Sequence, residues 1–507
     1  MNSGISILSL SGLVALPAIG FAQQQETRPN VVIILADDIG YGDLGWLGSK
    51  TIETPNVNRL GNEGIRFSNC HATSATSTPS RYGLLTGMYP WRRNDTGIAP
   101  GDAAMIIKPE QYTMADMFKD AGYATAAIGK WHLGLGDKAG KQDWNGEVTP
   151  GLKDIGFDYS FIMAATADRV PCVFIENGRA VNLDKNDPIE VSYTTPFPGE
   201  PTATTHPELM RMLPSDGHNM AIVDGVPRIG YMRGGKSALW HDEDIADRIT
   251  DKAIQFIASN NKKPFFLYFG TNDIHVPRVP NERFVGKSGM GPRGDAILSF
   301  DYCVGRVMHA LDSLGIADNT LIILSSDNGP VLDDGYQDKA VELLGNHKPG
   351  GVYRGGKYSI FEAGTRVPCI VWWKKGITKP AVSNALVSQL DFYASLSTLI
   401  NSKIPKNAAT DSQNELNALL GKTQSSRNYL VEQNLHNTLS VVSGDWKYIE
   451  PSHAAAINKG TNTELGNLPQ VQLYNIKTNP QETNNVAKNN AKIVQKLARL
   501  LSLERKK

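Results

Sequence analysis

Short, fully apolar runs recur along this chain and constrain its fold more than any other feature. The first, Val-Val-Ile-Ile-Leu-Ala at 31–36, is followed at once by Asp37 and Asp38. A run this apolar is typical of a strand buried on both faces, as in a parallel sheet. Comparable runs cover 123–128, 265–269, 321–324 and 370–373, with helical patterns between them. This alternation predicts an α/β fold with a mostly parallel sheet.

The pattern changes after about residue 400. Residues 401–427 are polar and poor in large apolar side chains, and we interpret them as a linker. Strand-like pieces follow, and then an amphipathic helix with Leu497 and Leu501 on its apolar stripe. Because 507 residues are too many for one ordinary core, we expect a large domain over 26–400 and a small α+β subdomain over 428–507.

The first 22 residues form an apolar stretch that ends in Gly20-Phe21-Ala22. This pattern indicates a secretory signal peptide over 1–22, too short for a membrane span. No Lys or Arg precedes the apolar stretch, so the α-amino group supplies the positive end or the true start lies elsewhere. The alternative is a buried N-terminal strand or helix. We expect the protein to be exported.

Composition excludes some partners. Lys plus Arg and Asp plus Glu both total 51, so the net charge is zero and no basic excess indicates a nucleic-acid partner. The four cysteines, Cys70, Cys172, Cys303 and Cys369, lack the paired spacing of a metal site. In an exported protein they allow up to two disulfides, in pairings that the sequence does not rank.

The segment Ser-Thr-Pro-Ser-Arg at 77–81, followed by Leu-Leu-Thr-Gly at 84–87, combines several helix-start signals. Pro79 has a φ suited to a first helical turn, and Ser77 or Thr78 is a natural cap before it. Residue 77 would then lie at a helix N-terminus, which favours an anionic group. Arg81 falls one turn later and can hydrogen-bond to oxygens there. The alternative is a loop that caps an ordinary helix.

Acidic residues follow two of the apolar runs. Asp37 and Asp38 end the first, and Ser-Asp-Asn-Gly at 326–329 ends another. Ligands of open α/β sheets bind beyond the carboxyl ends of the strands. Three carboxylates and the amide oxygen of Asn328 would form an anionic, all-oxygen site, which suits Ca²⁺ or Mg²⁺ better than zinc. Taken alone, each segment is also typical of a turn.

These segments together resemble the formylglycine-dependent sulfatase family, in its serine-type bacterial carbohydrate sulfatase form. Besides 77–87, the resemblance is carried by Gly-Lys-Trp-His-Leu-Gly at 129–134, Asn-Asp-Ile-His-Val-Pro at 272–277 and Arg-Gly-Gly-Lys at 354–357. It covers about 28–375 by motif and the C-terminal part by pattern. It implies an alkaline-phosphatase-like sandwich with a large, mostly parallel central sheet, and a small C-terminal antiparallel sheet with one helix.

The resemblance also implies roles for individual residues. Ser77 would be oxidised to formylglycine, whose hydrate attacks sulfur, and Arg81 would assist it. His132 would take the proton of the second hydroxyl so that sulfate leaves, and His275 would contact the sulfate ester and protonate the leaving oxygen. Lys130 and Lys357 would bind the sulfate. The metal ligands would be Asp37, Asp38, Asp327, Asn328 and residue 77; we expect Ca²⁺ rather than Mg²⁺, because nothing restricts the site to strict octahedral geometry.

A serine at position 77 implies a transient partner. In this family a radical iron–sulfur maturase oxidises the serine before export. Such enzymes are typical of anaerobic bacteria, which together with the export signal predicts a periplasmic location.

The stretch 160–240 matches the family least and is where leaving-group specificity is expected. Asp168, Arg169 and His218 are polar groups suited to reading sugar hydroxyls, and we assign them to the substrate. The overall pattern resembles exo-acting sulfatases that remove 6-O-sulfate from galactose or N-acetylgalactosamine of host or algal glycans. The alternative for these residues is local turns and salt bridges.

Other functions remain open at this point. The substrate could be another sulfated sugar or an aryl sulfate. A phosphodiesterase or phosphonate hydrolase of the same superfamily is a second possibility, although the additional His and Asp ligands of a two-metal site are not evident. A non-catalytic protein that binds sulfated glycans is a third.

Overall fold

The computed structural model describes residues 1, 28–47, 49 and 51–507. The signal peptide expected over 1–22 lies, beyond Met1, outside the described residues. Within them, no helix is long and apolar enough to cross a membrane. All four cysteines are described, and each is free and buried, so neither disulfide that the sequence allowed is formed.

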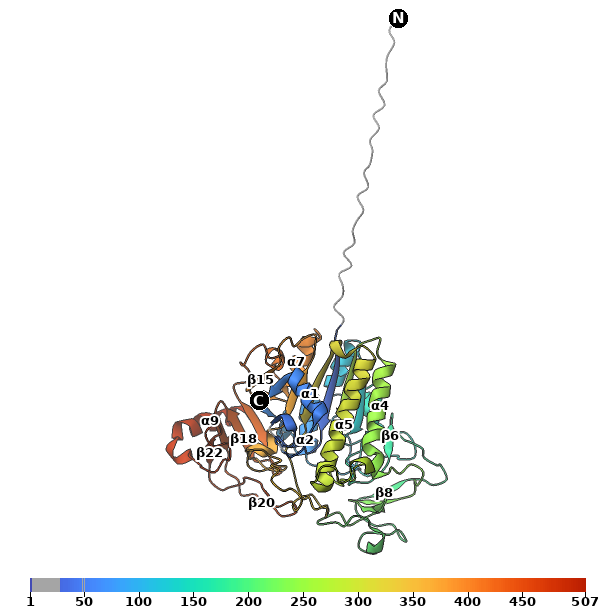
Figure 1. Ribbon diagram of the computed structural model, residues 1–507. Coiled ribbons are helices and arrows are strands. Elements are labelled where there is room, and N and C mark those ends of the chain that lie inside the picture. The colour runs from blue at the N-terminus through green and yellow to red at the C-terminus, as the bar shows by residue number, and fades with distance from the viewer. Residues whose placement is uncertain (2–27, 48, 50) are drawn as a thin grey trace.

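A ten-stranded sheet forms the centre of the molecule (Figure 1). Five neighbouring strands, β13, β1, β12, β4 and β5, are mutually parallel. Their bounds are Thr320–Ser326, Asn30–Ala36, Phe265–Gly270, Ala124–Lys130 and Tyr159–Met163. Beyond β13 lie β14 (Cys369–Trp372), β2 (Ile65–Phe67) and β15 (Ala381–Ser383), and beyond β5 lie β6 (Phe174–Glu176) and β7 (Arg179–Ala180). The predicted α/β fold with a mostly parallel sheet is confirmed.

One of the predicted strands runs in the opposite direction. The apolar run 370–373 forms β14, which pairs antiparallel with β13. A buried run has the same composition in either direction, so periodicity cannot distinguish them. Direction is set by the chain that connects the strands.

Helices cover both faces of the sheet. Phe265 of β12 contacts Phe256 of α4, with ring centroids 5.8 Å apart, whereas the next residue, Phe266, stacks on Phe118 of α3 at 4.3 Å. Successive strand residues point to opposite faces, so α3 and α4 lie on opposite sides. On the side of α4, helix α5 packs against α4 and α1 (Figure 1). Helices α2 and α7 belong to the layer of α3. The bounds are Pro55–Glu63 (α1), Ser77–Thr86 (α2), Met114–Asp120 (α3), Ile245–Ser259 (α4), Gly291–Ser313 (α5) and Asp391–Leu399 (α7).

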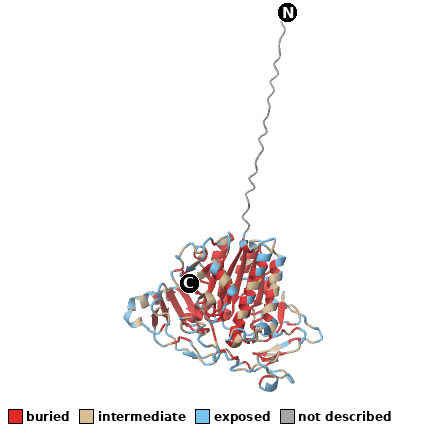
Figure 2. Ribbon diagram, in the orientation of Figure 1, coloured by how far each residue is buried: buried red, intermediate tan, exposed pale blue. Residues whose placement is uncertain are grey.

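The buried residues concentrate in this layered region (Figure 2). The stretch 160–240 instead forms loops and short hairpins at one end of the sheet. Smaller paired strands are β3 (Cys70–His71) with β16 (Val387–Ser388), β8 (Glu190–Ser192) with β11 (Tyr231–Arg233), β9 (Ile222–Val223) with β10 (Val226–Pro227), and β20 (Ile457–Asn458) with β21 (Thr463–Glu464).

A second, four-stranded antiparallel sheet forms the C-terminal subdomain, with helix α9 packed on it. Its strands are β17 (Leu430–Gln433), β18 (Leu439–Ser443), β19 (Trp446–Ile449) and β22 (Gln472–Asn475), and α9 spans Ala491–Glu504. Leu497 and Leu501 of α9 are buried, as their spacing predicted. This small sheet with one helix matches the expected architecture.

The segment 401–427 is more ordered than a linker. It contains the short helix α8 (Leu416–Leu419), and Ala418 and Leu419 are buried in the main core. Asp411 in this segment accepts hydrogen bonds from Arg92. The segment is polar in sequence because few of its side chains reach the core, and those few fix its position.

Candidate active site

The predicted site residues meet at the carboxyl ends of β1, β4, β12 and β13. Asp37 follows β1, His132 follows β4, His275 follows β12 and Asp327 follows β13. A cavity of about 90 Å³ opens above them. Its lining residues are Thr76, Ser77, Ile98, His132, Asp168, Arg169, His218, His275, Asp334, Lys357 and Tyr358. The other predicted residues lie beneath it, joined to these by the contacts that follow.

Helix α2 delivers Ser77 to the floor of this cavity. The N-cap is Thr76, whose extended backbone (φ −141°, ψ 151°) precedes the first helical residue, Ser77. The cap predicted at Ser77 or Thr78 is therefore wrong by one or two residues. As the first residue of the helix rather than its cap, Ser77 has a side chain that need not bond to its own backbone.

Arg81 fixes this hydroxyl from one turn along the helix, as predicted. Its Nε donates to Ser77 Oγ at 2.9 Å, and Nη2 donates to Asp327 Oδ2 at 2.8 Å. Its third nitrogen, Nη1, donates to Tyr268 Oη and to the Lys130 carbonyl, at 3.0 and 3.2 Å. The guanidinium is fully buried. It therefore has one orientation, with its charge beside residue 77.

The acidic residues beside Ser77 leave several oxygens unmatched. Asn328 donates through Nδ2 to Asp38 Oδ1 at 2.8 Å, whereas its own Oδ1 is buried and accepts no hydrogen bond from any described residue. Both carboxylate oxygens of Asp37 are likewise without a well-aligned hydrogen bond, although Oδ2 lies 2.6 Å from Lys130 Nζ. Buried acceptors without donors cost free energy. A cation would satisfy them.

The pKa values agree with this interpretation. Burial raises the pKa of Asp37 well above its ordinary value, and the neighbouring charges of Asp327 and Asp38 raise it further. Burial also acts on Asp327, but there Arg81 and Lys130 outweigh it and lower the pKa. The protein's own cations thus do not fully compensate a charge on Asp37. An all-oxygen donor set of this kind fits Ca²⁺ or Mg²⁺.

Two lysines approach the carboxylates from different sides. Lys130 Nζ lies 2.6 Å from Asp37 Oδ2, and Lys357 Nζ lies 2.8 Å from Asp38 Oδ2. Burial lowers the pKa of Lys130. Burial acts in the same direction on Lys357, but the carboxylates of Asp334 and Asp38 outweigh it and raise its pKa well above the ordinary value. Both ammonium groups lie where anionic oxygens would be bound.

His132 presents a basic nitrogen to residue 77. Its Nε2 lies 3.0 Å from the Ala99 carbonyl oxygen, which can only accept, so Nε2 carries the proton. Burial, with Lys130 and Arg169 nearby, lowers the pKa of His132 well below its ordinary value. The ring is therefore neutral, and its unprotonated Nδ1 faces Ser77 Oγ at 3.3 Å. This tautomer suits a general base.

His275 lies on the other side of the site. Its Nδ1 donates to the Val276 carbonyl at 2.7 Å, and one ring nitrogen lies within 4.8 Å of oxygens of Asp37 and Asp38. Burial, followed by the charges of Lys357 and Lys130, lowers the pKa of His275 well below its ordinary value. Without a bound anion, the surroundings of His275 thus favour its neutral form. An anion bound beside the ring would favour the protonated form.

The three residues assigned to the sugar line the same cavity. Arg169 Nη1 donates to Asp168 Oδ1 at 2.9 Å, and His218 Nε2 lies 2.8 Å from Asp168 Oδ2. The His218 ring also packs against Tyr336, with centroids 4.5 Å apart. Asp168 is held between the other two and fixes their direction. These side chains form a polar wall that faces Ser77 across the cavity.

Two lining residues of importance were not predicted. Asp334 Oδ2 accepts from Lys357 Nζ at 2.8 Å, and its Oδ1 accepts from Tyr358 Oη at 3.1 Å. Asp334 lies only a few residues after the predicted segment 326–329, which was a possible signal. Tyr358 follows Lys357 directly. Their pairing depends on how two loops meet, which the sequence pattern does not report.

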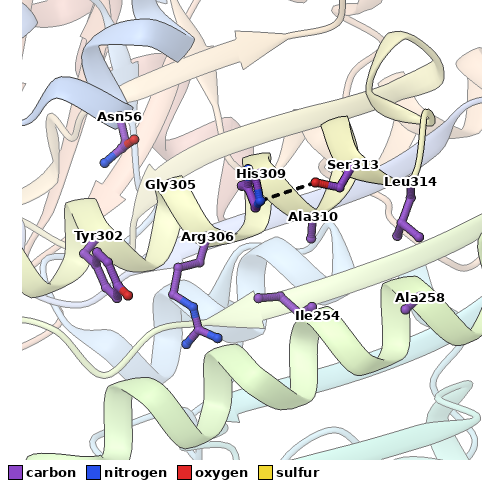
Figure 3. Close-up of a pocket in the computed structure, with 10 residues that line it drawn as sticks. All are labelled: Asn56, Ile254, Ala258, Tyr302, Gly305, Arg306, His309, Ala310, Ser313 and Leu314. Carbon is purple, nitrogen blue, oxygen red and sulfur yellow. Dashed lines mark hydrogen bonds between the residues drawn. The ribbon is translucent and has the colours of Figure 1, made fainter.

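A separate hollow of about 530 Å³ lies on the outer face between α4 and α5 (Figure 3). Figure 3 shows Ile254 and Arg306 beside it, with the hydrogen bond between His309 and Ser313 along α5. It contains none of the predicted site residues. Its size alone therefore does not make it a catalytic site.

Comparison with known proteins agrees with the geometry. A family model described as Sulfatase matches residues 29–402. An N-acetylgalactosamine-6-O-sulfatase of Bacteroides thetaiotaomicron is 57% identical over 478 residues, covering 94% of this chain and 93% of the relative. Human arylsulfatase A is 31% identical over 412 residues, covering 79% of this chain and 70% of the relative. A solved B. thetaiotaomicron structure, described in connection with the metabolism of multiple glycosaminoglycans, superposes with a TM-score of 0.94 at 56% identity, covering 95% of this chain and all of that one.

Proposed function

Because the chain belongs to the sulfatase family, we propose that it is an exo-acting enzyme that removes the 6-O-sulfate of N-acetylgalactosamine in glycans. Its sulfuric ester hydrolase activity follows from the family. The sugar is supported by the relative of that specificity, which is 57% identical over 94% of this chain. The observation that carries the proposal is the polar wall of Asp168, Arg169 and His218, which lines one cavity with Ser77. The galactose 6-sulfate ester is the second candidate.

We further propose that Ca²⁺ is held by Asp37, Asp38, Asp327, Asn328 and residue 77, and that Ser77 acts as formylglycine. The unmatched oxygens of Asp37 and Asn328 support the cation. When bound, it would neutralise charge on the sulfuryl oxygens and make a hydroxyl at residue 77 more acidic. The hydrate of formylglycine would offer one hydroxyl for attack and a second for release of sulfate.

The chain's own residues prepare the nucleophile. Arg81 donates to the oxygen of residue 77, and the N-terminus of α2 adds a favourable potential for negative charge there. Both lower the cost of an anionic oxygen at residue 77. His132 Nδ1, unprotonated and 3.3 Å away, can take a proton from a hydroxyl at that position.

Other residues receive the sulfate group. Lys357 lines the cavity and Lys130 lies buried beside Asp37, and their two positive charges can bind sulfuryl oxygens and stabilise charge that builds up during transfer. His275 can donate a proton to the leaving oxygen once an adjacent anion favours its charged form. The sugar wall then holds the leaving alcohol in line with the attack.

The shape of the cavity supports action at a chain end. Its volume of about 90 Å³ is small beside the range of about 300–1,000 Å³ that is typical of small-molecule sites, so the space around residue 77 is narrow. Asp168, Arg169 and His218 close one side. A pocket of this form suits one terminal sugar better than the interior of a polymer.

The test combines modification with specificity. The protein would be produced together with a serine-type radical maturase, and the peptide that contains residue 77 would be weighed by mass spectrometry. The same preparation would be incubated with the 6-O-sulfates of N-acetylgalactosamine, galactose and N-acetylglucosamine. The last sugar differs from the first only at the axial hydroxyl of C4, so it is a matched control.

We expect conversion of Ser77 to an aldehyde, and sulfate release that is fastest from N-acetylgalactosamine 6-sulfate. Conversion with equal rates on both epimers would contradict the role of the sugar wall. Conversion with release from other sulfated sugars alone would change the substrate but not the enzyme class. Faster cleavage of phosphate or phosphonate esters would favour a hydrolase of that kind, and binding without turnover in converted protein would favour a glycan-binding role.

We also propose that the protein is exported to the periplasm after a radical iron–sulfur maturase has acted on Ser77. The apolar stretch within residues 1–22 and the serine at position 77 support this proposal. Cell fractionation with N-terminal sequencing of the mature protein tests it. A cytoplasmic protein that retains Met1 would contradict it.

A further inference from the structure

Asp334 is an anionic side chain in a cavity expected to receive an anion, and the mechanism above gives it no role. Its side chain is 11% exposed and lines the cavity. A carboxylate cannot bind a sulfate directly, since like charges repel. Its contacts show what it does instead. One oxygen accepts from Lys357 Nζ at 2.8 Å and the other from Tyr358 Oη at 3.1 Å.

Lys357 is held between two carboxylates. Asp38 Oδ2 and Asp334 Oδ2 each lie 2.8 Å from its Nζ. Asp38 also belongs to the proposed cation site, where its charge would be shared with the metal. Asp334 belongs to no such set, so it is the partner that can keep the ammonium group aimed into the cavity. A long lysine side chain without this anchor would sample several rotamers.

Tyr358 completes the arrangement at some conformational cost. Its φ of 77° is unfavourable for a bulky residue, and such strain persists where surrounding contacts enforce it. The Tyr358 N–H donates to the Ala75 carbonyl at 2.7 Å, and its own carbonyl accepts from Leu435 N–H at 3.2 Å. Ala75 lies two residues before Ser77, and Leu435 belongs to the C-terminal subdomain. Tyr358 thus links the loop that carries Lys357 to the segment before Ser77 and to the C-terminal subdomain.

We propose that Asp334 and Tyr358 are positioning residues that hold the Lys357 ammonium group in its sulfate-binding orientation. Asp334 acts through the ion pair, and Tyr358 acts by fixing the carboxylate with its hydroxyl. The proposal rests on the sulfatase function of this site but not on the identity of the sugar.

The first test measures binding rather than turnover. Inorganic sulfate would be titrated into Ser77→Ala protein by calorimetry, in the presence of Ca²⁺, with and without Asp334→Asn. Removing the anchor should weaken sulfate binding by roughly 10–100-fold, the usual effect of losing a residue that orients a ligand group. Asp333→Asn is the matched control, because Asp333 instead accepts from Ser215 Oγ and Gly335 N. Unchanged sulfate affinity in Asp334→Asn would overturn the proposal.

The second test is a double-mutant cycle on kcat/KM, with any sulfate ester that the wild type hydrolyses. Asp334→Asn should lower kcat/KM much less in a Lys357→Ala background, because the ammonium group that Asp334 positions is then absent. Equal costs in both backgrounds would show that Asp334 acts independently of Lys357, and would overturn the proposal. Tyr358→Phe, which removes one hydroxyl, should lower kcat/KM by roughly 3–10-fold. Asp334→Glu should recover part of the loss.

These outcomes are separable from failure of the proposed function. If N-acetylgalactosamine 6-sulfate is not a substrate, sulfate binding and the cycle on another ester still test the positioning role. Circular dichroism of each variant identifies any that fail to fold. Tyr358→Phe keeps the test valid if Asp334→Asn is among them.

Discussion

Two buried clusters of charged side chains invite comparison. The catalytic cluster consists of Asp37, Asp38, Arg81, Lys130, Asp327 and Lys357. The junction cluster consists of His71, Glu362, Arg366, Glu432, Lys447 and Glu482. The junction cluster lies between the main domain and the C-terminal sheet. At each place three side chains lie close enough together to bind a metal: Asp37 and Asp38 with the neighbouring His275 at the catalytic cluster, and His71, Glu362 and Glu432 at the junction.

They differ in how their charges are matched. At the junction, Lys447 Nζ lies 2.9 Å from Glu362 Oε1 and 3.2 Å from Glu432 Oε2. The other oxygen of each glutamate contacts Arg366 or His71. Lysine therefore fills the position that a metal would take. Burial would raise the pKa of Glu432, but Lys447 and His71 outweigh it and lower the value to about 2.

In the catalytic cluster the balance is incomplete. The pKa of Asp37 is raised, chiefly by burial, and Asn328 Oδ1 accepts no hydrogen bond from the described residues. The cluster also underlies an open cavity. Buried charge or metal-like spacing alone thus does not identify a site here. Unmatched acceptors next to a cavity do.

The largest expected effect is a loss of activity without a loss of thermal stability. Ser77→Ala should lower the rate of sulfate ester hydrolysis by about 10⁴-fold or more, since it removes the proposed nucleophile, and leave the melting temperature nearly unchanged. Thr86→Val, on the same helix, is the control; its hydroxyl contacts the Tyr82 carbonyl. Substantial hydrolysis by Ser77→Ala would exclude residue 77 as the nucleophile.

Removing a lysine from each cluster should affect stability and activity in opposite ways. Lys447→Met should lower the free energy of unfolding by about 3–5 kcal/mol, because it leaves two buried glutamates without their shared cation. Lys130→Met should cost less stability, since burial already lowers the pKa of Lys130, but should abolish most activity. Urea unfolding and initial rates measure both. Equal losses of stability would break the distinction between the clusters.

Cation binding should stabilise the catalytic cluster specifically. At a Ca²⁺ concentration of about 100 times Kd, the free energy of unfolding should rise by about 2.7 kcal/mol over chelator-treated protein. Asn328→Ala should reduce this gain, because it removes an acceptor with no other partner. Thermal unfolding with and without chelator measures the stabilisation by Ca²⁺ in each protein. If Glu432→Gln at the junction reduced the gain equally, the assignment of the cation to the catalytic cluster would be wrong.

The smallest effect concerns the junction alone. Burial raises the pKa of Glu482 from 4.5 to about 8. The folded protein then binds one more proton than the unfolded chain between these values, so stability is full below pH 4.5 and falls as pH rises through 8. We expect a slope of about 1 kcal/mol per pH unit near neutrality.

Glu482→Gln should flatten this slope in urea unfolding between pH 5.5 and 8.5. Glu464→Gln is the control, because Arg354 lowers the pKa of Glu464 and its titration lies below this range. An unchanged slope in Glu482→Gln would assign the pH dependence to another group.

Much of the site was predictable because its residues follow strands or begin a helix. Asp37 and Asp327 end apolar runs, and Arg81 lies one helical turn from Ser77, so local periodicity places them. The cap of α2, the direction of β14 and the packing of 401–427 were not predicted correctly. Each depends on contacts with distant parts of the chain, which outweigh local preference.

Short motifs and regular spacing were enough to predict the fold class, the family and the residues proposed to carry the chemistry. Which charged side chains pair with one another depends on the folded chain. The folded structure pairs Asp334 with Lys357, gives His132 its tautomer through the Ala99 carbonyl, and places Lys447 between Glu362 and Glu432 of one buried cluster while leaving the acceptors of Asp37 and Asn328 at the other unmatched. The physical reason is that the energy of a buried charge depends on partners within a few ångströms, and these partners lie up to hundreds of residues apart in sequence.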